Sequence, residues 1–246
     1  KRKALLAAGG TGGHLFPALA LAEELIKDGW DVMIATDERG ARYDKSALNY
    51  ETVVISSATI KPGLMGKFKA VTALGKGITQ SFGIMRRYKP DVVVGFGGYP
   101  CFPPLFAAQI LKEPTIIHEA NAVLGKANKM LAAKANKIAL SLPKTKGVTD
   151  HKIFKEKAVV TGNPVRAAVV EKQGAPYPGL EHGGDFHIFV MGGSQGARVF
   201  SDVLPEAVKL LSESDQKRLT IVQQCREEDI DRTQKSYAAL GVKNTL

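Results

Sequence analysis

Cysteine is nearly absent from this sequence: Cys101 and Cys225 are the only two among 246 residues. Two cysteines can form neither a disulfide framework nor a zinc-ligand spacing, which fits a reducing compartment. The sequence also has no apolar run of the roughly 18 residues that a membrane-spanning helix needs. These absences argue against a disulfide-rich secreted domain, a cysteine-zinc module and a helical transmembrane protein.

Two familiar nucleotide-binding fingerprints are missing as well. The dinucleotide pattern needs a third glycine three residues after the second, and from Gly10 and Gly12 that position holds Leu15. The P-loop needs Gly-Lys-Ser/Thr, but the Gly-Lys pairs here are followed by Phe68, Gly77 and Ala127. A P-loop NTPase and a nicotinamide dehydrogenase are therefore disfavoured, although Asp37 leaves the dehydrogenase reading open.

The charge balance is strongly basic, with a net charge of +10 and a pI of about 9.5. Such a surface suits a polyanionic partner. Composition leaves three kinds open: a nucleic acid, an anionic membrane and a phosphorylated substrate. The sequence has no interleaving of aromatic and basic residues and no recognised nucleic-acid motif. We therefore expect no nucleic acid partner.

Strand and helix patterns alternate along the chain. Residues 3–8 are typical of a buried strand, residues 17–28 of an amphipathic helix with Pro17 in its first turn, and residues 31–35 of the next strand. Repeated alternation of this kind predicts an α/β fold with a parallel sheet.

The same unit, a strand followed by a glycine turn and a helix, opens both halves of the chain. The first turn spans residues 9–13 and the second residues 192–196. This repetition predicts two Rossmann-like domains. We expect them at residues 1–165 and 186–246, joined by a linker at residues 166–185 that is rich in glycine, proline and charge.

Polar clusters follow three further predicted strands, at residues 97–99, 118–121 and 162–166. Because parallel strands end at one edge of a sheet, these clusters and His14 are expected around a single site. A glycine turn at the start of a helix can bind phosphate through its free backbone N–H groups. It can also serve only to let the strand and the helix pack closely. Taken singly, His118 also fits a core histidine, and Asn163-Pro164 a plain turn.

Residues 9–18, Gly-Gly-Thr-Gly-Gly-His-Leu-Phe-Pro-Ala, closely resemble the N-terminal signature of the MurG family of N-acetylglucosamine transferases of peptidoglycan synthesis. Later motifs of that family are matched in order along nearly the whole chain by Gly97-Gly98-Tyr99-Pro100, His118-Glu119-Ala120-Asn121, Gly162-Asn163-Pro164-Val165-Arg166 and Gly192-Gly193-Ser194-Gln195-Gly196-Ala197-Arg198.

The resemblance implies a GT-B fold, with two Rossmann-like domains facing a cleft. It implies transfer of N-acetylglucosamine from UDP-N-acetylglucosamine to the muramyl sugar of lipid I at the cytoplasmic face of the bacterial plasma membrane, giving lipid II. The residues that it assigns to the sugar nucleotide are Thr11, Gly12, Gly13, Asn121, Arg166 and Ser194. The residues that it assigns to the acceptor and to catalysis are His14, Tyr99, His118 and Glu119.

The residue types suit an inverting transfer. His14, with an ordinary pKa near 6.5, is the expected base for the acceptor 4-hydroxyl, while Glu119 or His118 orients or replaces it. Arg166 and the backbone and side chains of Gly193, Ser194, Gln195 and Gly196 are expected to take up the charge of the leaving diphosphate. We expect no metal and no cofactor, because with these groups on the leaving diphosphate a metal bridge is unnecessary.

The second domain is short for a Rossmann-like domain, so we expect the C-terminal part to be missing and the donor site to be incomplete. The alternative function is a non-catalytic, membrane-associated remnant that retains mainly the acceptor domain.

Residues 60–76 alternate basic and apolar side chains. A basic surface with apolar side chains docks peripherally on anionic lipid, each lysine contributing about 1 kcal/mol. An ordinary helix with one buried face is the alternative. The segment predicts membrane contacts by Lys61, Leu64, Met65, Lys67, Phe68, Lys69, Leu74 and Lys76.

Overall fold

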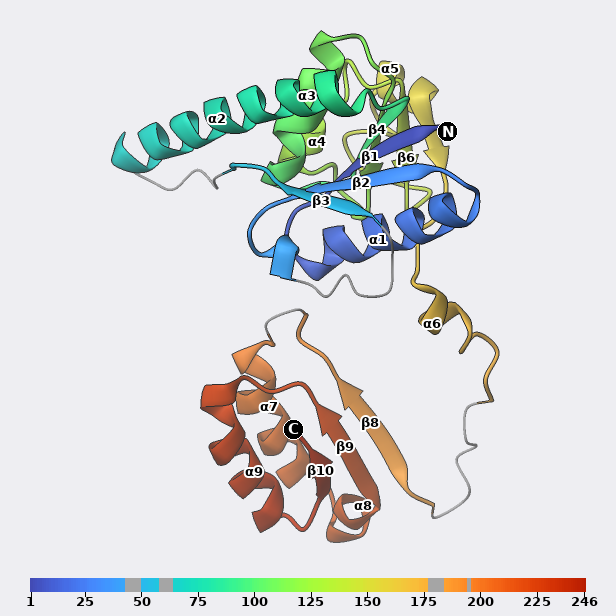
Figure 1. The fold of residues 1–246 in the computed structure, drawn as a ribbon. Coiled ribbons are helices and arrows are strands. Elements are labelled where there is room, and N and C mark those ends of the chain that lie inside the picture. The colour runs from blue at the N-terminus through green and yellow to red at the C-terminus, as the bar shows by residue number, and fades with distance from the viewer. Residues whose placement is uncertain (43–49, 58–63, 177–183, 194–195) are drawn as a thin grey trace. The chain divides into compact units, whose positions relative to one another are not determined.

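A computed structural model describes residues 1–42, 50–57, 64–176, 184–193 and 196–246, and gives the backbone alone for residues 64–69. It divides the chain into two compact units, Lys1–Gln173 and Gly174–Leu246 (Figure 1). The division falls within residues 166–185, the stretch predicted as the linker.

The first unit is built on a seven-stranded sheet in the order β3-β2-β1-β4-β5-β6-β7, with every neighbouring pair parallel. From β1 the chain runs outward to β3, then crosses back to β4 and continues outward to β7. The order therefore reverses between β1 and β4, and ligands of open α/β sheets bind beside such a point. The strands are β1 (Lys3–Ala7), β2 (Asp31–Thr36), β3 (Glu51–Val54), β4 (Val92–Gly95), β5 (Thr115–Glu119), β6 (Lys137–Leu140) and β7 (Ala158–Val160).

Both faces of the central strand β1 are buried. Leu5 and Ala7 point into one core, which includes residues of α2 (Leu64–Tyr88) and α3 (Phe102–Ile110). Ala4 and Leu6 point into the other core, with residues of α1 (Gly12–Lys27). Figure 1 shows α1 on the opposite face of the sheet from α2 and α3. This double burial explains why β1 is a continuous apolar run.

Helix α1 begins at Gly12, and the prediction that Pro17 occupies its first turn is wrong. Thr11 is the N-cap residue, and Pro17 lies inside the helix. The glycine loop is thus partly the first turn of the helix itself. Since the first N–H groups of a helix have no intrahelical acceptor, those of Gly12 and Gly13 point outward.

The remaining helices of the first unit are short: α4 (Lys126–Leu131), α5 (Lys152–Lys157) and α6 (Ala167–Val170), with 3-10 turns η1 (Gly40–Arg42) and η2 (Tyr99–Cys101). Helix α2, in contrast, is 25 residues long.

The second unit has a three-stranded parallel sheet in the order β10-β9-β8. Its small core gathers Val208, Leu219, Ile221, Tyr237 and Val242. The predicted order of strand, glycine-rich segment and helix is confirmed, since β8 precedes Gly192 and Gly193, and α7 follows them. The elements are β8 (Phe186–Val190), α7 (Arg198–Lys209), α8 (Glu213–Arg218), β9 (Leu219–Gln223), η3 (Glu227–Asp229), α9 (Ile230–Ala239) and β10 (Lys243–Thr245).

Candidate active site

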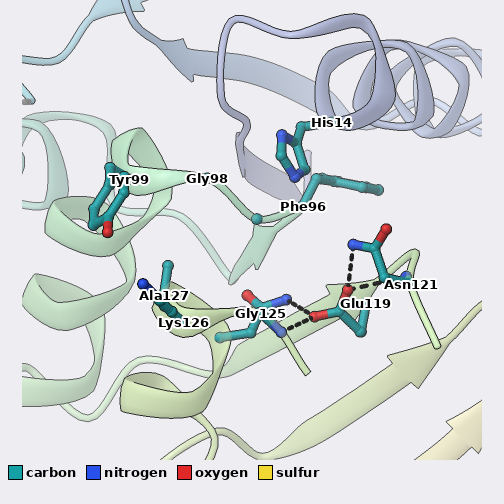
Figure 2. A pocket seen from close by; sticks show the side chains of 11 residues that line it. His14, Phe96, Gly98, Tyr99, Glu119, Asn121, Gly125, Lys126 and Ala127 are labelled. Carbon is teal, nitrogen blue, oxygen red and sulfur yellow. Dashed lines mark hydrogen bonds between the residues drawn. The ribbon is translucent and has the colours of Figure 1, made fainter. Parts of the chain in front are cut away.

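A pocket of about 260 Å³ opens at the carboxyl edge of the first sheet, where β1, β4 and β5 end. Figure 2 shows His14 on one side of it and Glu119 with Asn121 on the other. The sequence motifs at residues 9–14, 97–99 and 118–121 thus meet at one site, as predicted. The pocket is lined by His14, Phe96, Gly97, Gly98, Tyr99, Glu119, Asn121, Gly125, Lys126, Ala127 and Asn128.

His14 lies in the first turn of α1, and its ring borders the glycine turn after β4. Its Nδ1 lies 2.9 Å from the Thr11 hydroxyl oxygen. With the proton on Nδ1, the Thr11 oxygen accepts a hydrogen bond and Nε2 keeps its lone pair. Burial lowers the pKa of His14 below 6.5, and the opposing charge of Glu119 only partly offsets this. The ring is therefore neutral at neutral pH, as a general base must be.

Gly97 and Gly98 give the His14 ring its space. Both have a positive φ, +92° and +80°. A Cβ at Gly97 would lie 3.0 Å from Cδ2 and 3.1 Å from Nε2 of His14. The Cys101 thiol, whose pKa burial raises to about 12, lies 2.8 Å from the carbonyl oxygen of Gly97 and supports the turn.

Replacing Gly97 by alanine is expected to lower the turnover of the transferase reaction proposed below by about tenfold or more, because the methyl group displaces the ring of His14. Backbone strain adds a stability cost of about 1–3 kcal/mol. Gly29→Ala is the matched control, since Gly29 has φ +82° and open space around it. Steady-state kinetics and urea unfolding of both variants check this, and equal losses of turnover would contradict it.

Glu119, at the end of β5, is 2% exposed and its carboxylate accepts four hydrogen bonds. Oε1 accepts from the backbone N–H and the side-chain amide of Asn121, at 3.0 and 2.9 Å. Oε2 accepts from the Gly125 N–H and from Asn128 Nδ2, at 2.8 and 3.0 Å. These donors occupy the carboxylate, so the arrangement favours a role in positioning the loop between β5 and α4 over a role as base.

His118 is only 3% exposed and is not among the residues that line the pocket. Its Nε2 lies 3.3 Å from the Gly162 carbonyl oxygen and 3.1 Å from the Ser141 hydroxyl, and its ring packs against Phe96 at 5.2 Å. Burial lowers the pKa of His118 below 6.5, against the raising effects of the Gly162 carbonyl and Glu119. The geometry favours the alternative of a core histidine, which here fastens the segment that leads to Arg166.

The stability of the first unit is expected to depend on these two histidines. Their pKa values are below 6.5 in the folded protein, so below pH 6.5 the unfolded chain binds more protons. The free energy of unfolding should be highest above pH 6.5 and fall as the pH is lowered through the folded pKa values.

His118→Gln should make this fall smaller, because glutamine donates to Gly162 without titrating. Urea unfolding at pH 7.5 and 5, followed by fluorescence of Trp30, the single tryptophan of the chain, measures it. His187→Gln, at an exposed residue of the second unit, is the control. Identical pH slopes for His118→Gln and the unchanged chain would contradict the assignment.

Arg166, the N-cap residue of α6, lies beside the start of α1. Its guanidinium carbon lies 4.3 Å from the centre of the Phe16 ring, and a Cβ at Gly12 would approach the same ring within 2.9 Å. The structure thus brings the motif at residues 162–166 next to Thr11, Gly12 and Gly13. Arg166 is exposed and does not line the pocket itself.

The second glycine turn belongs to the second unit. Gly193 has φ +81° and is exposed, and the carbonyl oxygen of Gly196 lies 3.4 Å from both Nε and Nη2 of Arg226. Gly192 must be glycine, since a Cβ there would lie 2.4 Å from the nitrogen of Ala197. The predicted site residues Ser194 and Gln195 lie outside the described residues.

Sequence reasoning missed Phe96, Gly125, Lys126, Ala127 and Asn128. Phe96 directly follows β4, a position that the rule on carboxyl strand ends would have found. The other four reach the pocket because Glu119 holds the following loop, and no sequence pattern signals this.

Within the described ranges, no group of three or more His, Cys, Asp or Glu side chains is arranged to hold a metal ion. None of the helices in the described part of the chain combines the length and the apolar character needed to cross a membrane.

Two parallel α/β units, with a pocket at the reversal of the strand order in the first, fit the GT-B fold class. Residues 4–140 match the glycosyltransferase family 28 N-terminal domain, and residues 187–245 match the family 28 C-terminal domain. The chain belongs to glycosyltransferase family 28.

Curated relatives confirm the resemblance to the MurG family. A UDP-N-acetylglucosamine–N-acetylmuramyl-(pentapeptide) pyrophosphoryl-undecaprenol N-acetylglucosamine transferase of Rhodospirillum centenum is 47% identical over 242 residues, 98% of this chain and 63% of the relative. The transferase of the same name from Mesorhizobium japonicum is 49% identical over 245 residues, 97% of this chain and 63% of the relative. The chain thus spans under two thirds of the length of these relatives.

Solved structures confirm the predicted fold class. The crystal structure of MurG from Acinetobacter baumannii superposes with a TM-score of 0.72 at 29% identity, covering 100% of this chain and 67% of that chain. UDP-GlcNAc 2-epimerase of Neisseria meningitidis, at 15% identity and a TM-score of 0.63, shares the fold alone. The superposition covers 99% of this chain and 71% of the epimerase chain.

Proposed function

We propose that this chain is part of an inverting transferase that moves N-acetylglucosamine from UDP-N-acetylglucosamine to the muramyl 4-hydroxyl of lipid I, forming lipid II. The observation that carries the proposal is the pocket beside the reversal of the strand order, with a neutral His14 on its wall. The relatives are named as N-acetylglucosamine transferases that act on UDP-N-acetylglucosamine and N-acetylmuramyl-(pentapeptide) pyrophosphoryl-undecaprenol.

In the proposed reaction His14 Nε2 takes the proton of the acceptor 4-hydroxyl as its oxygen attacks the anomeric carbon of the donor. A bond forms between that oxygen and the anomeric carbon, and the bond from the carbon to the diphosphate breaks. The electron pair leaves with UDP. Thr11 orients the base through its contact with Nδ1, and Glu119 positions Asn121 in the pocket wall.

The donor is proposed to contact Thr11, Gly12, Gly13 and Asn121 in the first unit, together with Arg166. The N-terminus of α1, a helix of 16 residues, favours the negative diphosphate through its N–H groups and dipole. Gly193, Ser194, Gln195 and Gly196 are proposed to contribute from the second unit. Tyr99, in the pocket wall, is proposed to contact the acceptor.

A transfer assay tests the proposal on the 246-residue chain. Labelled UDP-N-acetylglucosamine is added to lipid I in vesicles, lipid II is quantified, and binding of each substrate is measured separately. Transfer would support the proposal. Binding of lipid I without binding of UDP-N-acetylglucosamine would fit an incomplete donor site, and transfer by a form of the protein with a complete second domain then separates the proposal from the non-catalytic alternative. Binding of neither substrate would contradict both.

We also propose that helix α2 contacts an anionic membrane surface. Lys76 is exposed, Leu74 is half-buried, and Val71, one turn earlier, is 67% exposed, which suits an interfacial helix. Lys61 lies outside the described residues, and of Leu64, Met65, Lys67, Phe68 and Lys69 only the backbone is described.

Changing Lys61, Lys67, Lys69 and Lys76 together to glutamate is expected to weaken binding to anionic vesicles by roughly a thousandfold, at about 1 kcal/mol for each lysine. Co-sedimentation with phosphatidylglycerol vesicles measures it. A control with the same charge change replaces the exposed lysines Lys209, Lys217, Lys235 and Lys243 of the second unit. Equal losses for the two variants would mean that net charge, and not this helix, directs binding.

A further inference from the structure

A second pocket, of about 360 Å³, opens at the carboxyl ends of β2 and β3 and shares no lining residue with the candidate active site. Its polar lining comes from three elements: residues 37–39 after β2, Ser56 and Ser57 after β3, and Lys76 and Gln80 on α2. None of these residues takes part in the proposed transfer step. The pocket therefore has polar groups whose use the reaction leaves unexplained.

Helix α2 brings two hydrogen-bond donors to this pocket. Gly77 is buried, and a Cβ there would lie 2.1 Å from the carbonyl oxygen of Ser56, so glycine lets α2 pack closely against the end of β3. The N–H of Ser56 donates to Gln80 Oε1 at 2.9 Å, and this fixes the other end of the amide as nitrogen. Gln80 is half-buried, and Lys76, one turn earlier, is exposed. The Nε2 amide group and the Lys76 ammonium can both donate to a ligand in the pocket.

The charges that line the pocket balance. Asp37 Oδ1 accepts from the N–H of Gly40 at 3.0 Å, and Oδ2 accepts from Nε and Nη2 of Arg39 at 3.0 and 2.8 Å. Asp37 and Arg39 thus compensate each other, which leaves one cation, Lys76, and one anion, Glu38. A diphosphate would need an excess of positive charge, whereas a peptide offers a carboxylate to the cation and N–H groups to the anion.

The two pockets adjoin the same short loop. A Cβ at Gly9 would lie 3.4 Å from His14 Nδ1, and a Cβ at Gly10 would lie 2.0 Å from Asp37 Oδ1. Consecutive Cα atoms are about 3.8 Å apart, so a single step along the chain leads from the proposed base to the lining of the second pocket. A group that is attached to the acceptor sugar next to its reacting hydroxyl can therefore extend into the second pocket.

We propose that the second pocket binds the peptide of the acceptor, with a carboxylate of that peptide held by Lys76 and by Gln80 Nε2. The inference rests on the proposed function, and the names of the relatives include the pentapeptide. The peptide is attached through the lactyl ether at the 3-position of the muramyl sugar, beside the 4-hydroxyl that His14 deprotonates. An extended pentapeptide spans up to about 17 Å, which is enough to pass Gly9 and Gly10.

The test compares two water-soluble lipid I analogues with a short prenyl chain, in buffer without vesicles. One carries the pentapeptide with its free carboxylates, and in the other every carboxylate of the peptide is converted to a carboxamide. Calorimetry gives the dissociation constant of each analogue for the 246-residue chain and for its variants. Because no membrane is present, the proposed membrane contact of Lys76 does not enter the result. The ratio of the two constants within one variant cancels general damage to the pocket.

The unchanged chain is expected to bind the amidated analogue about tenfold more weakly, because a carboxylate makes charge-assisted hydrogen bonds that a carboxamide does not. Gln80→Glu keeps an acceptor for the N–H of Ser56 and puts an anionic oxygen in place of Nε2, so this preference should vanish. Lys76→Gln should lose most of the preference, and it carries the test alone if Gln80→Glu does not fold. Arg86→Gln is the control and should keep the preference, since Arg86 is exposed on the same helix and does not line the pocket.

Equal binding of the two analogues by the unchanged chain would overturn the peptide site alone, and so would an undiminished preference in the Lys76 and Gln80 variants. Failure of the unchanged chain to bind the analogue with free carboxylates would overturn the proposed function, and this inference with it.

Discussion

Replacing His14 by alanine in the active transferase is expected to lower turnover by about 10² or more, the usual contribution of a positioned general base. The affinity for UDP-N-acetylglucosamine should change little, because the base acts on the acceptor hydroxyl. Steady-state kinetics with lipid I and direct donor binding measure the two effects separately. His187→Ala, at an exposed residue of the second unit, should leave both unchanged.

The pH dependence of kcat/KM provides a second test of His14 as the base. Burial lowers the pKa of His14, so the acid limb of kcat/KM should lie below pH 6.5 and the rate should rise as the ring loses its proton. His14→Gln, which can still hydrogen-bond Thr11 but cannot act as a base, should lose this limb. Turnover close to that of the unchanged protein, or an unaltered acid limb, would remove His14 from the reaction.

Replacing Glu119 by glutamine is expected to destabilise the first unit by about 3 kcal/mol. Each carboxylate oxygen accepts two hydrogen bonds, so an amide nitrogen in place of either oxygen would face two N–H donors. The loop that carries Asn121 and Gly125, and the start of α4 with Asn128, would lose their anchor, and turnover should fall as a result.

Urea unfolding monitored through Trp30 fluorescence measures the change in the first unit. Glu156→Gln is the matched control in the same unit, since Glu156 is exposed on α5 and should cost less than about 0.5 kcal/mol. If the two variants were equally stable, the four hydrogen bonds would not be holding the loop in solution.

Much of the fold was predictable because its signals are local. The apolar run at residues 3–8 predicted a buried strand, and β1 is buried. The glycine turns at residues 9–13 and 192–196 predicted strands followed by helices, and both units have this order, although β8 is largely exposed. The predicted start of α1 was wrong because glycines are poor helix formers and proline usually marks a first turn. In the structure α1 nevertheless begins at Gly12 and contains Pro17, and Leu15 in its first turn packs on the core beside the sheet. Propensity alone does not report that packing.

The sequence by itself determined that the polar motifs meet at one edge of a parallel sheet, because carboxyl strand ends always share an edge. Only the tertiary structure decided what each side chain does there. His118 and Glu119 are neighbours on β5, and successive side chains of a strand point to opposite faces. One is therefore buried against Phe96, while the other anchors the loop that brings Asn128 to the pocket. Which residue faces which way depends on how α1 and α4 cover the sheet, and the sequence pattern does not carry that information.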